Sequence, residues 1–155
     1  KDICCNPMRI SHDAADPVAY RFAHGRKKAA IVTDLGNYND YTVESLKGMD
    51  ALLLEANHDI NMLQVGPYPY YLKQRILGDK GHLSNERAGQ LLTRLIHDDL
   101  QAVLLGHLSK ENNMPELAYE AVRVEMTMAD EGIAVRDLPM QVARRNEVTP
   151  VIHIA

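Results

Sequence analysis

The fold is decided first by the stretch Ala29–Gly36, whose sequence is Ala-Ala-Ile-Val-Thr-Asp-Leu-Gly. Its first five residues are small, apolar or β-branched, which predicts a buried strand, and Asp-Leu-Gly then indicates a turn. Two further apolar runs follow the same plan: Ala51–Leu54 leads into Glu55, and Ala102–Leu105 leads into Gly106-His107. Each predicted strand therefore ends beside a side chain that can bind a metal or transfer a proton.

Helical signals separate these predicted strands. Ser84 is a capping residue without a full capping box, and apolar residues at helical spacing follow it. The other predicted elements are a strand over Val18–Phe22, a helix over Asn39–Lys47 with Gly48 as its C-cap, a helical turn over Asp59–Val65, a helix beginning near Pro115, and short β-prone pieces over Ile133–Ile154. Strands that alternate with helices predict an α/β layered domain.

Bulk composition limits the class of protein. A chain of 155 residues predicts one domain, and a net charge of −4 gives no electrostatic signature of nucleic-acid binding. A nuclease is still compatible with this charge, because bound metal ions can supply positive charge locally. Cys4 and Cys5 are adjacent, which fits neither zinc spacing nor a disulfide framework. The lack of a disulfide framework predicts a cytoplasmic protein, and because no apolar run is long enough to span a bilayer we expect no membrane partner.

Polar residues at the ends of neighbouring strands form the first candidate site. In α/β sheets, sites form outside the carboxyl ends of strands, so Asp34, Glu55 and His107 are expected to converge. His12 and His82 lie in similar settings, and the tetrapeptide Gly-His-Leu-Ser occurs twice, at 81–84 and at 106–109. A single His or Asp at a strand end is usually a cap or a solvated group. The set as a whole carries the prediction.

These motifs resemble the metallo-β-lactamase superfamily. They are Ser-His-Asp-Ala from Ser11, Thr-Asp-Leu-Gly from Thr33, Glu-Ala-Asn-His-Asp from Glu55, and the two Gly-His-Leu-Ser sequences. The resemblance is nearest to the YycJ/WalJ branch, close to ribonuclease Z and PhnP, and extends from about Ile10 to Leu108. It implies an α/β fold: a mixed sheet with helices packed on it, forming half of the αββα metallo-β-lactamase sandwich.

The resemblance also implies roles for individual residues. His12 and His107 correspond to metal-binding histidines, and Asp34 to the aspartate that bridges two metal ions. Glu55 and His82 correspond to the acid–base pair of the ribonuclease Z branch. His58 is a further candidate for the catalytic pocket. The implied cofactors are two divalent ions, zinc or manganese.

One departure from the family pattern is large. The superfamily signature His-x-His-x-Asp-His, which lies in the N-terminal half of the fold, does not occur in this sequence. We therefore expect residues 1–155 to be the C-terminal part of a metallo-β-lactamase-fold domain. The ligands present would give each ion two protein ligands, whereas catalytic zinc normally has three. On this basis we expect the fragment alone to be inactive and to associate with a second copy through its exposed sheet.

The resulting hypothesis is a hydrolase of phosphodiester bonds, of nuclease or exonuclease type, in the parent protein. Tyr68 could stack on a base, and Lys73 and Arg75 could contact a phosphate backbone; a packed loop and solvated helix charges are the plainer interpretations. Arg144 and Arg145 are expected on a solvated face. Two alternatives stay open: a small-molecule hydrolase of cyclic phosphates or thioesters on the same fold, and a non-catalytic half-domain that self-associates.

Overall fold

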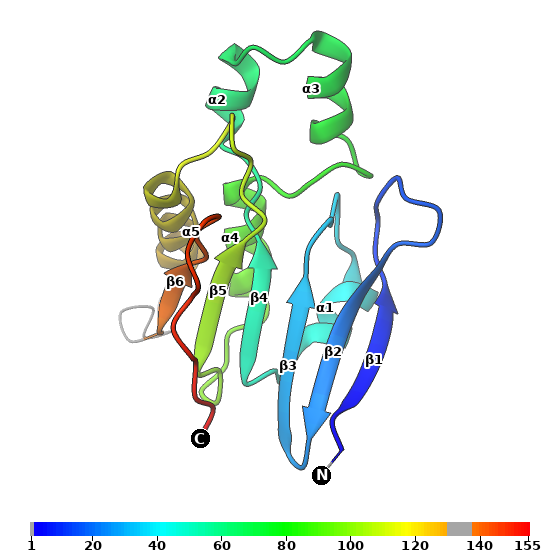
Figure 1. The fold of residues 1–155 in the computed structure, drawn as a ribbon, viewed down its shortest axis with the longest axis vertical. Coiled ribbons are helices and arrows are strands. Elements are labelled where there is room, and N and C mark those ends of the chain that lie inside the picture. Colours follow the sequence, from blue (N-terminus) through cyan, green and yellow to red (C-terminus); the bar gives the residue numbers. More distant parts are fainter. Residues whose placement is uncertain (1, 130–137) are drawn as a thin grey trace.

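A mixed sheet of six strands runs through the molecule, and the computed structural model describes it over residues 2–129 and 138–155 (Figure 1). The strands are β1 (Cys4–Arg9), β2 (Val18–His24), β3 (Lys27–Val32), β4 (Ala51–Glu55), β5 (Ala102–Gly106) and β6 (Met140–Val142). The helices are α1 (Asp40–Leu46), α2 (Ile60–Val65), α3 (Tyr70–Leu77), α4 (Asn85–Thr93) and α5 (Pro115–Ala129).

The strand order in the sheet is the order in the chain, β1 to β6. The pairs β1–β2 and β2–β3 are antiparallel, whereas β3, β4, β5 and β6 run parallel to one another. The parallel strands thus bring their carboxyl ends to one edge of the sheet, as the sequence predicted. Helices α2 and α3 stand beyond this edge, at the top of Figure 1.

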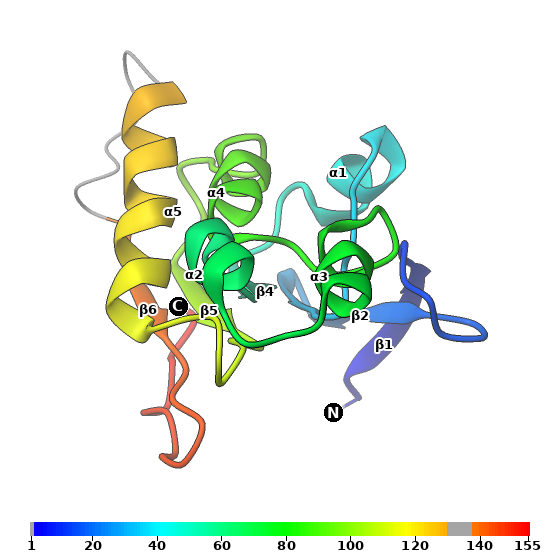
Figure 2. The same cartoon turned by 90° about the horizontal axis from the view of Figure 1, so that it is seen from above.

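The core lies between the sheet and one layer of helices. Alternate residues of β3 and β4, such as Ala30, Val32 and Leu54, are at most 2% exposed. Helices α1, α4 and α5 pack on this face (Figure 2). On the other face, Tyr20 and Ile31 are 44% and 42% exposed, so this face of the sheet is much less buried than the face under the helices.

The predicted helix boundaries are confirmed by their caps. Asn39 forms a capping box with Thr42, Asp59 caps α2, and the Ser84 side chain accepts a hydrogen bond from the Arg87 amide. The C-cap of α1 is Lys47 and not Gly48 as predicted; Gly48 follows it with a φ of 70°, a conformation that glycine adopts without a steric penalty.

Two elements have no counterpart among the elements predicted from the sequence: strand β1 and helix α3. Strand β1 was not anticipated; it includes Cys4 and Cys5 and pairs with β2 along its whole length. Of the expected β-prone tail, residues 133–137 lie outside the described part, and β6 is its one strand among the residues described. Within the described ranges, no helix is both long and apolar enough to cross a membrane.

Candidate metal centre

The candidate site is built at the carboxyl edge of the parallel strands. Asp34 follows β3, Glu55 is the last residue of β4, and His107 comes directly after β5. His12 reaches the same place from the β1–β2 loop and His82 from the segment between α3 and α4. The predicted convergence is therefore observed, with residues from five separate parts of the chain.

Asp34 and His107 have unusual backbone conformations. Their φ angles are 59° and 57°, and among the described residues no other non-glycine residue has a positive φ. Such left-handed conformations are uncommon outside glycine and tend to occur at functional sites, where the surrounding structure holds them. Both residues turn the chain immediately after a strand, so that their side chains face the shared site.

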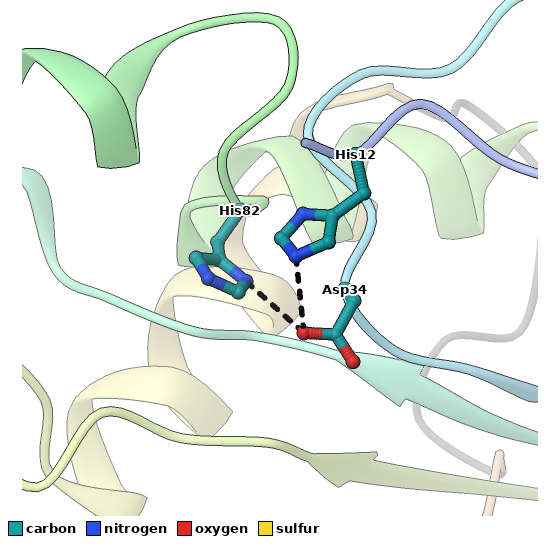
Figure 3. Close-up of side chains that lie close together, drawn as sticks. All are labelled: His12, Asp34 and His82. Atoms are coloured by element: carbon teal, nitrogen blue, oxygen red, sulfur yellow. Dashed lines mark ion pairs between the residues drawn. The ribbon is translucent and has the colours of Figure 1, made fainter. Parts of the chain in front are cut away.

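One oxygen of Asp34 is surrounded by three imidazole rings. Its Oδ1 lies 3.6 Å from His12 Nε2, 3.8 Å from His107 Nε2 and 4.0 Å from His82 Nδ1. Figure 3 shows the His12 and His82 rings directed at this carboxylate. All three separations exceed an ordinary hydrogen bond. They match the distance of roughly 3–4 Å between two ligand atoms that share one ion at about 2.0–2.2 Å.

The hydrogen bonds of the rings show which nitrogens are free to bind an ion. The Nδ1 atom of His12 lies 3.0 Å from the Gly81 carbonyl oxygen. A carbonyl oxygen can only accept, so Nδ1 carries the proton and the lone pair of Nε2 faces Asp34. His107 is oriented in the same way by Glu55, with Nδ1 on the carboxylate and Nε2 towards Asp34. This is the usual arrangement of a metal-binding histidine held by an outer hydrogen bond.

His82 is oriented differently. Its Nδ1 atom is both the atom bonded to Glu55, at 2.7 Å, and the atom nearest Asp34. Its Nε2 atom therefore lies on the other side of the ring from both carboxylates. The division of roles implied by the resemblance, in which His12 and His107 bind metal while His82 pairs with Glu55, stays a prediction, because His107 lies at the same 2.7 Å from Glu55 as His82.

The structure also permits other groupings of ligands. Among the described residues, two sets have ligand atoms within 4.8 Å of one another: His12, Asp34 and His82, and Glu55, His82 and His107. His82 belongs to both sets, whereas the resemblance placed His107 with His12 and Asp34. The donor set of imidazole nitrogens and carboxylate oxygens suits zinc, with manganese favoured where carboxylate and water dominate.

Glu55 is the buried anchor of the site. Its side chain is 0% exposed, and its Oε1 atom accepts hydrogen bonds of 2.7 Å from both His82 and His107. Its Oε2 atom accepts from the Leu35 amide. Burial alone would raise the pKa of this carboxyl, but the hydrogen bonds from the two imidazoles outweigh burial and lower it. In turn, the bond to Glu55 raises the pKa of His107.

Asn57 connects the loops of the site and was not singled out from the sequence. Its Nδ2 atom donates to the His107 carbonyl oxygen at 2.8 Å, which holds the left-handed turn. Its backbone N–H donates to the Leu83 oxygen, and its own carbonyl accepts from the Ser109 amide. The one sequence feature that could have pointed to Asn57 is its position inside the Glu-Ala-Asn-His-Asp motif. An asparagine in such a position is usually a turn residue, so the motif alone did not single it out.

His58 lies behind the site. It is 1% exposed, and its Nδ1 atom is 3.4 Å from the Asn57 side-chain oxygen. Burial lowers the pKa of His58 to about 4. The ring is therefore neutral at physiological pH, and its contact with the site runs through Asn57.

Two glycines allow the loops of the site to approach closely. A Cβ atom at Gly81 would collide with the Arg75 and Ile76 carbonyl oxygens, and one at Gly36 would collide with the backbone at Asp79. His82 and Asp34 are thus positioned by backbone contacts that only glycine permits.

A cavity of about 510 Å³ opens over the candidate metal-binding residues. Tyr68 and Arg75, two of the three residues assigned to substrate from the sequence, line this cavity, whereas the third, Lys73, is not among its lining residues. The Arg75 Nε atom, however, is bonded to the Asp13 carboxylate, and Lys73 donates to the Gln64 carbonyl oxygen at 2.7 Å. The cavity is also lined by Lys110 and Arg145, which the sequence did not place at the site.

Two curated proteins, both longer than this chain, are similar to it in sequence. The chain is 39% identical over 153 residues to the exodeoxyribonuclease WalJ of Streptococcus pneumoniae, covering 99% of this chain and 56% of that protein. It is 40% identical over 134 residues to the exodeoxyribonuclease YycJ of Bacillus anthracis, covering 86% and 50%. The chain thus spans about half the length of the curated relatives it matches. No protein-family model matches it.

Solved structures show the same fold. The metallo-β-lactamase fold protein YhfI of Bacillus subtilis superposes with a TM-score of 0.62 at 14% identity, over 92% of this chain and 47% of that one. A diphosphatase of the PhnP family superposes with a TM-score of 0.50 at 19% identity, over 90% and 39%. The chain therefore has the metallo-β-lactamase fold. In sequence it is similar to the WalJ and YycJ proteins over about half of their length.

Proposed function

We propose that the whole protein is a metal-dependent phosphodiesterase that acts on nucleic acid, and that residues 1–155 form the C-terminal part of its domain. The observation that carries the proposal is the position of Asp34 Oδ1 within 4.0 Å of three imidazole nitrogens, two of whose rings are fixed by the buried Glu55. The exodeoxyribonuclease names of the WalJ and YycJ relatives support the substrate class.

In this proposal, His12 Nε2, His107 Nε2 and Asp34 hold two divalent ions, zinc or manganese, with further ligands from the part of the relatives' length that this chain does not match. When bound, such ions lower the pKa of a water molecule and stabilise negative charge on the phosphate. Asp34, whose Oδ1 atom lies near both the His12 and the His107 nitrogens, would contribute its carboxylate to the binding of both ions.

His82 is proposed as the general acid. The Nδ1–H group of His82 donates a hydrogen bond to Glu55, which fixes the ring and leaves Nε2 to exchange a proton with the leaving oxygen. Glu55 does not leave this position, because it is buried and also bonded to the Leu35 amide. His58, which the sequence also suggested for catalysis, is proposed to act through Asn57 and not on the substrate. Tyr68 and Arg75 remain proposed substrate contacts at the cavity wall.

The alternative of a small-molecule hydrolase has one observation in its favour. The cations predicted to bind a phosphate backbone are engaged elsewhere, Arg75 by Asp13 and Lys73 by the Gln64 carbonyl. A short phosphodiester or a thioester needs no such backbone contacts. Self-association of the isolated chain through the exposed sheet face, and a cytoplasmic location, also stay predictions.

The test uses the whole protein loaded with manganese or zinc. Its substrates are single-stranded DNA, a cyclic nucleotide phosphate, a thioester and bis(p-nitrophenyl) phosphate. We expect cleavage of DNA and of the small diester, both lost in Asp34→Asn and retained in the surface control Glu125→Gln. Cleavage of the thioester alone would favour the alternative. Metal-loaded protein that leaves every phosphodiester intact would refute the proposal.

A further inference from the structure

A second cavity, of about 590 Å³, adjoins the candidate metal centre. The two cavities share the segment His107–Lys110 and Arg145 as a common wall. Beyond that wall, the second cavity continues between the start of α5 and the segment 143–147. A ligand too long for the first cavity could therefore extend into the second without crossing the core.

The common wall carries two cationic side chains. The Nη2 atom of Arg145 donates to the Leu108 carbonyl oxygen at 2.8 Å, which anchors the guanidinium to the loop that follows His107. A guanidinium has five N–H donors, so this bond leaves others for a ligand. The positive charge of Arg145 acts against the rise in the pKa of His107, as expected for a neighbouring charge. Lys110 has a side chain 77% exposed and lies 3.9 Å from Glu111.

The charges are unequal on the two sides of the metal centre. On the His12 side, Arg75 is bonded to Asp13, so the cation there already has an anionic partner. On the other side, Arg144 is paired with Glu147 at 3.3 Å, while Arg145 is bonded to a neutral carbonyl. Glu116 also lines the second cavity. The cation best placed to take a new anion is thus Arg145, and Lys110 lies beside it with only a long, exposed ion pair to Glu111 at 3.9 Å.

We propose that Lys110 and Arg145 bind a phosphate of a nucleic-acid strand, next to the scissile one, and direct the strand into the second cavity. This subsite rests on the proposed function, because it supposes that the metal centre holds the scissile phosphate. Phosphate contacts of this kind position a strand without reading its bases. A small diester would occupy the metal centre alone and would not reach the subsite.

The experiment separates strand binding from chemistry in the whole, manganese-loaded protein. Arg145→Gln keeps an N–H donor for the Leu108 carbonyl but removes the charge, and Lys110→Gln removes the other charge. Arg123→Gln is the matched control, because Arg123 is an exposed cation on α5 paired with Glu120. Binding of a non-hydrolysable single-stranded oligonucleotide is measured over a range of salt, and kcat/KM is measured with the oligonucleotide and with bis(p-nitrophenyl) phosphate.

We expect Arg145→Gln and Lys110→Gln each to weaken oligonucleotide binding about tenfold. Each should also reduce the magnitude of the slope of log K against log salt by about 0.7, the value for one single-strand phosphate contact. Hydrolysis of the small diester should stay within about twofold of wild type, and Arg123→Gln should change none of these quantities.

Three results bear on the proposal in different ways. Equal losses with oligonucleotide and small diester would overturn it, because Arg145 would then act by holding the His107 loop. Unchanged oligonucleotide binding in both variants would also overturn it. If the wild type cleaves no phosphodiester, the proposed function fails separately, and the salt slopes still decide whether a strand binds at these residues.

Discussion

Replacing Glu55 by glutamine in the whole protein should lower the free energy of unfolding by about 3 kcal/mol. Oε1 of Glu55 accepts from two imidazoles and Oε2 from the Leu35 amide, in a fully buried position. Glutamine has one oxygen and one NH2 group, so in either orientation of the amide its NH2 group faces an N–H donor and cannot accept a hydrogen bond from it. A buried donor left unpaired costs about 1–3 kcal/mol, and each charge-assisted bond that becomes neutral loses about 1 kcal/mol more.

The assay is urea unfolding of metal-free wild type and Glu55→Gln. The matched control is Glu125→Gln, because Glu125 is a partly exposed carboxylate bonded only through Gln90 among the contacts described for it. We expect the control to stay within about 1 kcal/mol of wild type. A Glu55→Gln variant as stable as the control would refute the reasoning, since the carboxylate would then hold neither histidine.

The pH dependence of this difference has a definite sign. The pKa of Glu55 is lowered by folding, so its contribution to stability is present above its unfolded pKa of about 4.3 and is lost as the pH falls through the folded pKa. The pKa of His107 is raised, so its contribution is present below about pH 6.5 and is lost as the pH rises through the folded value. The difference between wild type and Glu55→Gln should therefore be largest between about pH 4.3 and pH 6.5, and it should shrink both in acid and as the pH rises through the folded pKa of His107.

Three further predictions follow from the residues around the site. Asn57→Ala should weaken manganese binding by about tenfold, because the His107 carbonyl loses the amide that holds its turn. Isothermal titration calorimetry would measure this affinity. The control is Asn85→Ala, which removes a buried side-chain amide paired only with Asn113 among the contacts described and should leave the affinity unchanged. Gly81→Ala should shift the His82 loop and lower kcat by about 10²-fold with little change in fold, as read by enzyme kinetics and circular dichroism. His58 is neutral in the fold with a pKa of about 4, so stability should fall by about 3 kcal/mol between about pH 6.5 and pH 4; a His58→Gln variant with the same acid slope in urea unfolding would contradict this.

Local signals in the sequence predicted much of the fold. The apolar runs became β3, β4 and β5, and Ser84 caps the helix that it was expected to begin. These features depend on neighbours within a few residues, so they can be inferred without the tertiary structure. Strand β1 could not be inferred, because five of its six residues are exposed and its pairing with β2 alone defines it.

The sequence predicted which residues would meet at the site, but not which hydrogen bonds would join them. Chain order placed Asp34, Glu55 and His107 at one edge, because parallel strands share their carboxyl edge. The sharing of Glu55 by His82 and His107 depends on side chains 27 and 52 residues away along the chain. The same is true of Arg75, which reaches Asp13 across 62 residues. Pairings at such separations leave no periodicity in the sequence.

The most direct test of the account is the metal content of the whole protein after loading with manganese or zinc and desalting, compared with Asp34→Asn. Asparagine tolerates the left-handed conformation at this position, so the variant should fold. We predict about two ions per wild-type chain and fewer than about one in the variant, because the residue proposed to bridge both ions is lost. Equal metal content in the two proteins, or none in the wild type, would contradict the central claim that Asp34 and its histidines form a metal centre.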